Sequence, residues 1–181
     1  MAVYQESGLR LTLADGSHFR FADLAAYRSI SGQNLKEMDF AWAEGQNLVL
    51  LELRNYLDVT GTLTGADFVP RKGEATPKRF NDLVDKVTDS LLMILAARAQ
   101  TTWGKQLATQ WPPVINQVKT LTLVIAIELK QELAVHLQAL RDSLNARLQG
   151  RLAVAGVSRV ALLDYSRLKQ HPRFSGVVAC D

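Results

Sequence analysis

The stretch that decides the fold is Met38–Tyr56, MDFAWAEGQNLVLLELRNY. Two apolar segments flank a polar turn, a pattern that predicts a β-hairpin. If the turn is Gly45-Gln46, or a four-residue loop over 44–47, Asp39 lies directly opposite Glu52. Facing residues of an antiparallel pair point to the same side, with Cβ atoms roughly 4.5–5.5 Å apart. Two like charges there destabilise the hairpin unless a cation lies between them.

The composition is that of an ordinary globular protein. The 181 residues are 48% hydrophobic and 22% charged, and a chain of this length can bury roughly 70% of its unfolded surface. The net charge of +3 is compatible with a nucleic-acid partner but is too small to indicate one alone. The single cysteine, Cys180, excludes an intramolecular disulfide and a cysteine zinc site. We therefore expect one domain over 1–181 in a cytoplasmic setting.

Targeting and membrane signals are missing from the sequence. The first residues lack the basic start and apolar core of a signal peptide. The longest apolar run in a helical context, Leu91–Ala97, is much shorter than the roughly 20 residues that span a bilayer. We expect no membrane partner.

The remaining periodicities predict a mixed α/β fold with a central mixed sheet flanked by helices. Helices separate the later strands, so these strands are expected to be parallel to a neighbour. We expect an N-terminal hairpin and short helix within 1–35, an α/β core over 36–165, and a solvated basic tail over 166–181. The first half of the chain is expected to form a hairpin of Leu9–Leu13 and His18–Phe21, a helix over Asp23–Arg28, the hairpin around Gly45 and a loop over 57–76. The second half is expected to form a helix from Pro77 (N-cap Thr76) to about Gln100, a strand covered on both faces over Val118–Leu129, a helix from Leu133 ending at Gly150, and a strand over Arg159–Asp164.

A polar cluster is expected at the hairpin end away from the turn. Strand alternation places Glu52, Arg54 and Tyr56 on one face, and the register puts Glu37 opposite Arg54. Oxygen ligands beside a cation are what Mg²⁺- or Mn²⁺-assisted phosphodiester chemistry uses. The alternative is a surface ion cluster in which Arg54 and Lys36 neutralise the acids without a metal.

The sequence EMDFAWAEGQNLVLLELRN resembles the active-site hairpin of the PD-(D/E)XK nuclease superfamily. In that superfamily an Asp on one strand is followed on the next by an acidic residue, one spacer and a Lys. By this resemblance Asp39 and Glu52 take the acidic positions, and Arg54 takes the lysine position. The helix and buried strand that follow also match, so the resemblance extends over roughly 39–129. It implies a restriction-endonuclease-like fold, a metal site at Asp39 and Glu52, and catalysis that also involves Arg54.

Arg54 departs from the superfamily pattern. Arginine stays protonated and cannot serve as a base, although its planar fork can hold a phosphate or offset negative charge. Some members place the lysine elsewhere, and here Lys36, Lys78 and Lys86 are the candidates. Many members also carry an acid on an earlier helix, for which the candidates are Asp23 and Glu6.

Further side chains could contact a nucleic acid. Tyr56 either stacks on a base or forms the edge of the core. The loop cations either bind backbone phosphates or belong to a solvated loop: Arg71, Lys72, Lys78 and Arg79. The three histidines show no ligand or triad spacing, and neither a P-loop nor a dinucleotide fingerprint is present.

Three functions are compatible with the sequence, and the last is an interaction subunit unrelated to nucleic acid. The first is a nuclease that uses Mg²⁺ or Mn²⁺ to cleave phosphodiesters of DNA or RNA. The second is a catalytically inactive nuclease-fold module that binds nucleic acid or a protein partner. The choice between DNA and RNA stays open, as does the oligomeric state, for which a homodimer is one option.

Overall fold

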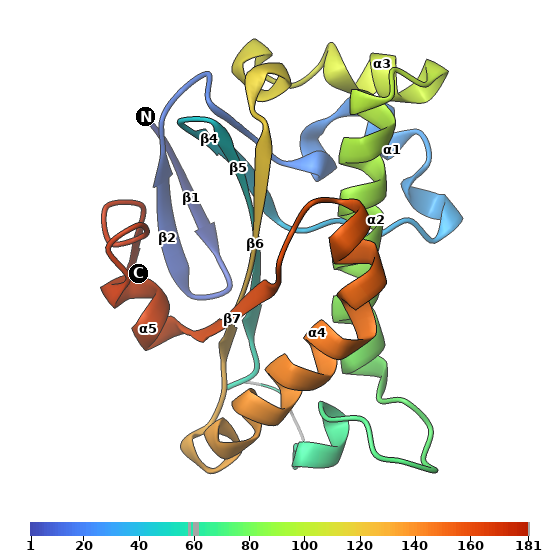
Figure 1. Cartoon of the computed structure of the whole chain (residues 1–181). Helices are drawn as coiled ribbons and strands as arrows, with labels where there is room; N and C mark the ends of the chain where they lie inside the picture. The colour runs from blue at the N-terminus through green and yellow to red at the C-terminus, as the bar shows by residue number, and fades with distance from the viewer. Residues whose placement is uncertain (58, 60–61, 181) are drawn as a thin grey trace.

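The computed structural model describes residues 1–57, 59 and 62–180 (Figure 1). The strands are β1 Ala2–Glu6, β2 Leu9–Leu13, β3 His18–Phe19, β4 Phe40–Glu44, β5 Asn47–Asn55, β6 Thr120–Glu128, β7 Val160–Asp164 and β8 Val178–Cys180. The α-helices are α1 Ala25–Arg28, α2 Lys78–Arg98, α3 Thr102–Ala108, α4 Leu137–Val154 and α5 Tyr165–Gln170. Short 3-10 helices cover Phe21–Asp23, Ser31–Gln33, Gly65–Asp67, Pro113–Gln117 and Gln131–His136.

The main sheet has five strands in the order β3-β4-β5-β6-β7. Strands β3, β4 and β5 are antiparallel neighbours, whereas β5, β6 and β7 are parallel. The long helix α2 lies in the connection from β5 to β6, and α4 lies in the connection from β6 to β7. The predicted mixed α/β fold with a mixed central sheet is therefore confirmed.

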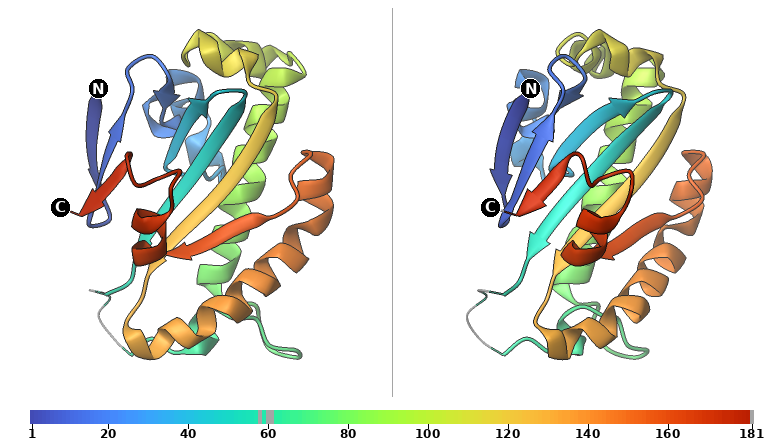
Figure 2. Two further views of the ribbon diagram at one scale, coloured as in Figure 1. Left: turned by 60° about the vertical axis from the view of Figure 1, so that its left-hand side comes forward. Right: turned by 90° about the vertical axis from the view of Figure 1, so that its left-hand side faces the viewer.

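The molecule is built in layers (Figure 2). Helices α2 and α4 cover one face of the main sheet, while the small antiparallel sheet β1-β2-β8 and helix α5 lie on the other. Strand β6 is central, which is why its apolar residues are buried on both faces as the sequence predicted. None of the helices in the described part of the chain is long and apolar enough to cross a bilayer.

The hairpin register is the predicted one. Phe40 faces Leu51 and Glu44 faces Asn47 across the turn, in which Gly45 has a φ of 58°. Strand β5 is longer than β4 and continues to Asn55 beside β6. Asp39 is thus the residue just before β4, at the point where the hairpin ladder ends.

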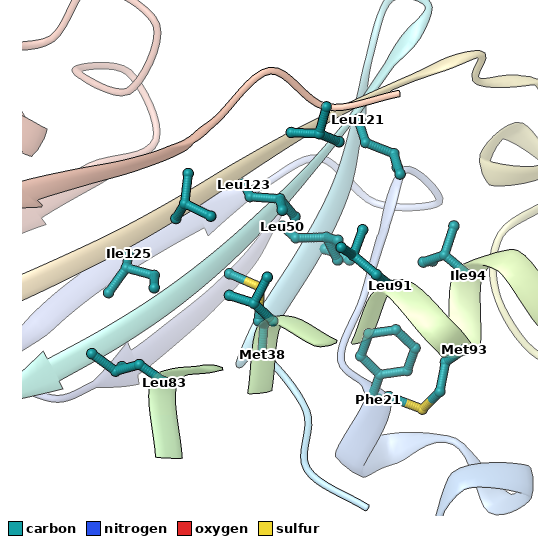
Figure 3. Packing of buried hydrophobic residues seen from close by; sticks show 14 of the residues in the cluster. Phe21, Met38, Leu50, Leu83, Leu91, Met93, Ile94, Leu121, Leu123 and Ile125 are labelled. Atoms are coloured by element: carbon teal, nitrogen blue, oxygen red, sulfur yellow. The ribbon is translucent and has the colours of Figure 1, made fainter. Parts of the chain in front are cut away.

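The alternation of β5 divides its apolar side chains between two clusters. Leu48 and Leu50 share a cluster with Leu83, Leu91 and Ile94 of α2 and with apolar residues of β6 (Figure 3). The cluster on the other face contains Val49, Leu51, Leu53, Phe40, Leu168 and Phe174. Burying one such side chain contributes about 1.5–3 kcal/mol. Glu52 is on the α2 side of β5, between the apolar Leu50 and the charged Arg54 of the same strand face.

The predicted first hairpin is wrong. Strand β2 pairs with β1 and β8, whereas β3 pairs with β4 of the main sheet. The hairpin at the start of the chain joins β1 to β2 through Ser7-Gly8, whose φ values of 54° and 79° suit a tight turn. Strand β1 was missed because alternate residues are only partly buried, which leaves a weak hydrophobic pattern.

The later helices and the tail also differ from expectation. The leucine stripe of α4 continues through Leu152, and the helix passes Gly150 to end at Val154, before Gly156 with a φ of 71°. Helix α3 was not predicted. The prediction of a solvated basic tail is wrong because the tail forms α5 and β8, and Phe174 is 2% exposed.

Candidate functional site

Asp39 and Glu52 meet where the hairpin ladder ends. The backbone N–H of Leu53 donates to Asp39 Oδ2 at 2.8 Å, which fixes one oxygen of that carboxylate. The Glu52 side chain is 0% exposed and the Asp39 side chain 16%. The segment before β4 is tied to α2 because Met38 N donates to Ser90 Oγ at 2.9 Å. Two acidic side chains are therefore held together beneath α2.

Lys86 of α2 supplies the cation that this pair requires. Its Nζ lies 3.3 Å from Asp39 Oδ1 and 2.9 Å and 3.0 Å from the two oxygens of Glu52. The Lys86 side chain is only 14% exposed. Of the three lysines that the sequence offered, this is the one that the structure brings to both carboxylates.

Helical spacing explains how Lys86 reaches the site. Lys86 comes three residues after Leu83 and four before Ser90, and both of these are buried. Residues three and four apart share a helix face, so Lys86 lies at the edge of the apolar stripe. This spacing was visible in the sequence and could have separated Lys86 from the other two lysines.

Arg54 makes a second contact with Glu52. Its Nη2 lies 2.7 Å from Glu52 Oε1, the same oxygen that is 2.9 Å from Lys86 Nζ. Neither contact has hydrogen-bond geometry at Oε1, which is buried and has no hydrogen-bond partner within the described chain. The Glu52 carboxylate is thus paired by charge with two cations, Lys86 and Arg54.

Burial and then the neighbouring Asp39 carboxylate raise the pKa of Glu52 to about 8. Lys86 and Arg54 act in the opposite direction but do not cancel the effect of burial. A carboxyl group with this pKa exchanges its proton near neutral pH. Perturbed acids of this kind concentrate at functional sites, although structural ion-pair networks produce them too.

Glu37 does not join this cluster as expected. The Tyr27 hydroxyl of α1 donates to Glu37 Oε2 and lies 3.0 Å from the Leu35 carbonyl oxygen. Burial, followed by the bond to Glu37, raises the pKa of Tyr27. Glu37 lies apart from the two acids because the hairpin ladder ends at Phe40, so position 37 is no longer in register with β5.

Neither of the other two candidate lysines makes an ion pair with Asp39 or Glu52 within the described residues. Lys36 Nζ pairs with Asp82 at 2.9 Å and Asp85 at 2.8 Å on the outer side of α2. Lys78 is exposed in the first turn of α2, and eight residues separate it from Lys86, about 12 Å along the helix axis. Neither candidate for an additional acid joins the site: Glu6 pairs with Arg20 at 3.0 Å, and Asp23 is exposed in the first 3-10 helix.

A pocket of about 400 Å³ opens beside the site at the carboxyl end of β5. Arg54 and Lys86 line it together with Lys36, Arg79 and Tyr56, which gives it four cationic side chains. The Arg79 guanidinium lies over the Tyr56 ring at 5.3 Å, and the Phe68 ring packs against Tyr56 at a centroid distance of 5.1 Å. Tyr56 therefore forms a wall of the pocket and supports Arg79.

The remaining loop cations do not line this pocket. Arg71 and Lys72 are exposed, and Arg71 Nη1 lies 4.0 Å from Glu74 Oε1. Of the four basic residues expected to contact phosphates, the structure places Arg79 at the site. The expected loop over 57–76 includes residues 58, 60 and 61, which lie outside the described residues, and its later part forms the 3-10 helix Gly65–Asp67.

The site offers two carboxylates to a metal. Within the described residues, no three His, Cys, Asp or Glu side chains come together as a metal-binding group. Comparison with family models, curated proteins and solved structures finds no match for this chain.

Proposed function

We propose that the protein is a Mg²⁺- or Mn²⁺-dependent nuclease of the PD-(D/E)XK type that cleaves phosphodiesters of DNA or RNA. Asp39 and Glu52 are its metal ligands, and Lys86 supplies the lysine that the strand motif lacks. The observation that carries this proposal is the contact of Lys86 Nζ with both facing carboxylates, at 2.9–3.3 Å.

The arrangement of the strands supports the proposal. The antiparallel hairpin β4-β5 followed by α2 and the buried strand β6 is the order that the resemblance to a restriction-endonuclease-like fold implies. Asp39 directly precedes β4 and Glu52 lies within β5, in keeping with that resemblance. The pocket also lies beyond the carboxyl end of a parallel strand, where open α/β sheets bind their ligands.

The acidic pair is suited to a hard divalent cation. Mg²⁺ is commonly held by one or two protein carboxylates, with water and substrate phosphate oxygens completing its coordination. Two carboxylates that are held close together and contact the same ammonium group, those of Asp39 and Glu52, fit this requirement. When bound, the metal would polarise the phosphoryl oxygen and offset its negative charge.

The cations around the pocket have separate roles in this proposal. Arg54 holds the scissile phosphate with its planar guanidinium, and Lys86 transfers a proton at Nζ, which an arginine cannot do. Arg79, fixed by Tyr56, binds a neighbouring phosphate of the substrate. Lys36 lies on the same side but is already paired with two aspartates, so its contribution is smaller.

The direct test is cleavage of plasmid DNA, single-stranded DNA and RNA, each with Mg²⁺ or Mn²⁺. The matched control is the Asp39→Asn/Glu52→Gln variant, purified in parallel to reveal contaminating nuclease. Metal-dependent cleavage by the unaltered protein, absent from the variant, is the expected result. Equal products from both proteins, or none from either, would refute a nuclease function.

One observation favours the second function, an inactive binding module. Lys86 and Arg54 already compensate the two carboxylates, so the cluster is electrostatically complete without a metal. A module of this kind would bind nucleic acid with a strong salt dependence but would leave it uncut. Salt-dependent binding that survives in the Asp39→Asn/Glu52→Gln variant, with no cleavage by either protein, identifies this second function.

A further inference from the structure

We propose a second binding site, separate from the Asp39–Glu52 pair, for a small organic anion with an apolar body. The site is a cavity of about 750 Å³ between the carboxyl end of α2, helix α3 and the segment that leads into β6. This inference does not rest on the proposed nuclease function.

The cavity lies at the amino ends of the parallel strands. Leu48 at the start of β5, and Val118 and Lys119 just before β6, contribute to its lining. Glu52 and Arg54 lie further along β5, toward the opposite end of the sheet. In Figure 1 helix α3 and the segment before β6 gather at the top of the molecule, whereas β5 and β6 run downward from there. A ligand in this cavity would therefore not touch the acidic pair.

The charge of the lining has one sign. Arg98, Lys105 and Lys119 line the cavity, and no Asp or Glu is among its lining residues. None of the three makes an ion pair with an acidic group in the described part of the chain. Three uncompensated cations around one cavity repel each other, and an anion between them relieves that repulsion.

The floor of the cavity is apolar. Leu48, Ile94 and Ala97 are at most 2% exposed, and Ile115 is 4% exposed. Trp111 adds an aromatic side chain that is 5% exposed. Ligand sites commonly combine such an apolar lining with a few charged groups that orient the ligand. The ligand should therefore carry its anionic group at one end of an apolar or aromatic body.

The walls are held in place by specific contacts. Gly104 lets α3, which carries Lys105, approach α2 so closely that a Cβ atom there would lie 2.1 Å from the Ala96 carbonyl oxygen. Arg98 Nη2 donates to the Val118 carbonyl oxygen at 3.3 Å. Trp111 Nε1 donates to Asn116 Oδ1 at 2.8 Å. These contacts join α2 and α3 to each other and to the segment before β6, so the walls of the cavity are held by the packing of the fold itself.

The volume and the lining favour a small molecule over a nucleic-acid strand. Sites for small ligands usually have volumes of about 300–1,000 Å³. A nucleic-acid backbone is bound mainly by charge, so a buried apolar floor of leucine and isoleucine would add little to its binding. An aromatic sulfonate, carboxylate or phosphate matches both the charge and the floor.

The test uses 8-anilino-1-naphthalenesulfonate as the probe, with its fluorescence and the quenching of tryptophan fluorescence as readouts. We expect one saturable site, at least tenfold weaker in Lys105→Glu/Lys119→Glu and unchanged in the charge-matched control Arg147→Glu/Arg151→Glu on the exposed side of α4. The neutral analogue N-phenyl-1-naphthylamine, which lacks the sulfonate, should bind more weakly than the anion.

Three results would overturn the proposal. The first is equal affinity of the unaltered protein and Lys105→Glu/Lys119→Glu for the sulfonate, and the second is equal binding of the neutral analogue. The third is loss of binding to a single-stranded oligonucleotide in Lys105→Glu/Lys119→Glu without any change for the sulfonate, which would make this face a nucleic-acid contact. All four charge-altered residues are exposed, so the variants should keep the unfolding temperature of the unaltered protein.

Discussion

Replacing Lys86 by Met removes the ammonium group but keeps a long side chain at the edge of the α2 stripe. The change leaves Glu52, whose side chain is 0% exposed, beside Asp39 with Arg54 as the remaining cation. Breaking a buried ion pair typically destabilises a protein by 3–5 kcal/mol. Lys86 is itself 14% exposed and Glu52 can take up a proton, so we expect a loss of about 3 kcal/mol in the free energy of unfolding.

Urea unfolding followed by circular dichroism measures this loss, with Lys78→Met as the control on the same helix. Lys78 is exposed, so its replacement should change stability by no more than about 0.5 kcal/mol. A divalent metal should take the place of the ammonium between the carboxylates, and Mn²⁺ at 100 times its Kd would then return about 2.7 kcal/mol to Lys86→Met. Cleavage should fall by about 10²- to 10⁴-fold. The reasoning fails if Lys86→Met is as stable as Lys78→Met in the absence of metal, or cleaves at the rate of the unaltered protein.

Three further predictions concern the pKa of Glu52, the role of Arg54 and the packing of two helix glycines. The pKa of Glu52 is about 8 in the folded protein, above its unfolded value, so the folded state holds a proton that the unfolded chain releases. Stability without metal should therefore fall by no more than about 5 kcal/mol as the pH rises from about 4.5 to 8, and denaturation of Glu52→Gln at several pH values should show a flatter profile. Arg54→Ala should lower kcat about 10²-fold and weaken substrate binding while Mn²⁺ still binds, and kinetics that match the unaltered protein would exclude a phosphate contact. Gly104→Ala places a Cβ 2.1 Å from a backbone oxygen, so thermal unfolding should show a loss of about 2 kcal/mol or more in the free energy of unfolding. Gly150→Ala, with open space around it inside α4, should instead raise that free energy by about 0.5–1 kcal/mol.

The hairpin and the elements after it were predictable because local signals agree there. A glycine turn and two apolar segments determine one register, and that register placed Asp39 opposite Glu52. The period of α2 and the β-branched run of β6 are equally clear. In each of these segments the local pattern and the tertiary contacts favour the same structure.

The N-terminal and C-terminal segments depend on pairing between distant parts of the chain. Strand β8 pairs with β2 across nearly the full length of the sequence, and no local pattern indicates that partner. The predicted hairpin placed its turn at Asp15-Gly16, but Ser7-Gly8 is an equally good turn signal. The choice between them depends on the pairing of β3 with β4 of the main sheet, which leaves β2 to pair with β1.

The site was partly predictable for the same reason. Strand alternation and register placed the two acids and Arg54 together, and in the structure Arg54 contacts Glu52 while Lys86 contacts both acids. The identity of the lysine required the position of α2 relative to β5, which the hairpin sequence alone does not determine. Glu37 was misplaced because the antiparallel register was extended beyond Phe40, where the chain instead runs along α2 and Met38 bonds to Ser90.

The most direct test of the central claim is a Mn²⁺ titration by isothermal calorimetry, comparing the unaltered protein with Asp39→Asn/Glu52→Gln. We expect one Mn²⁺ site in the unaltered protein, whose affinity increases with pH up to about 8 as Glu52 loses its proton, and no binding at this site in the variant. Equal Mn²⁺ affinity in the two proteins, or no binding by the unaltered protein at pH 8, would contradict a metal site at Asp39 and Glu52.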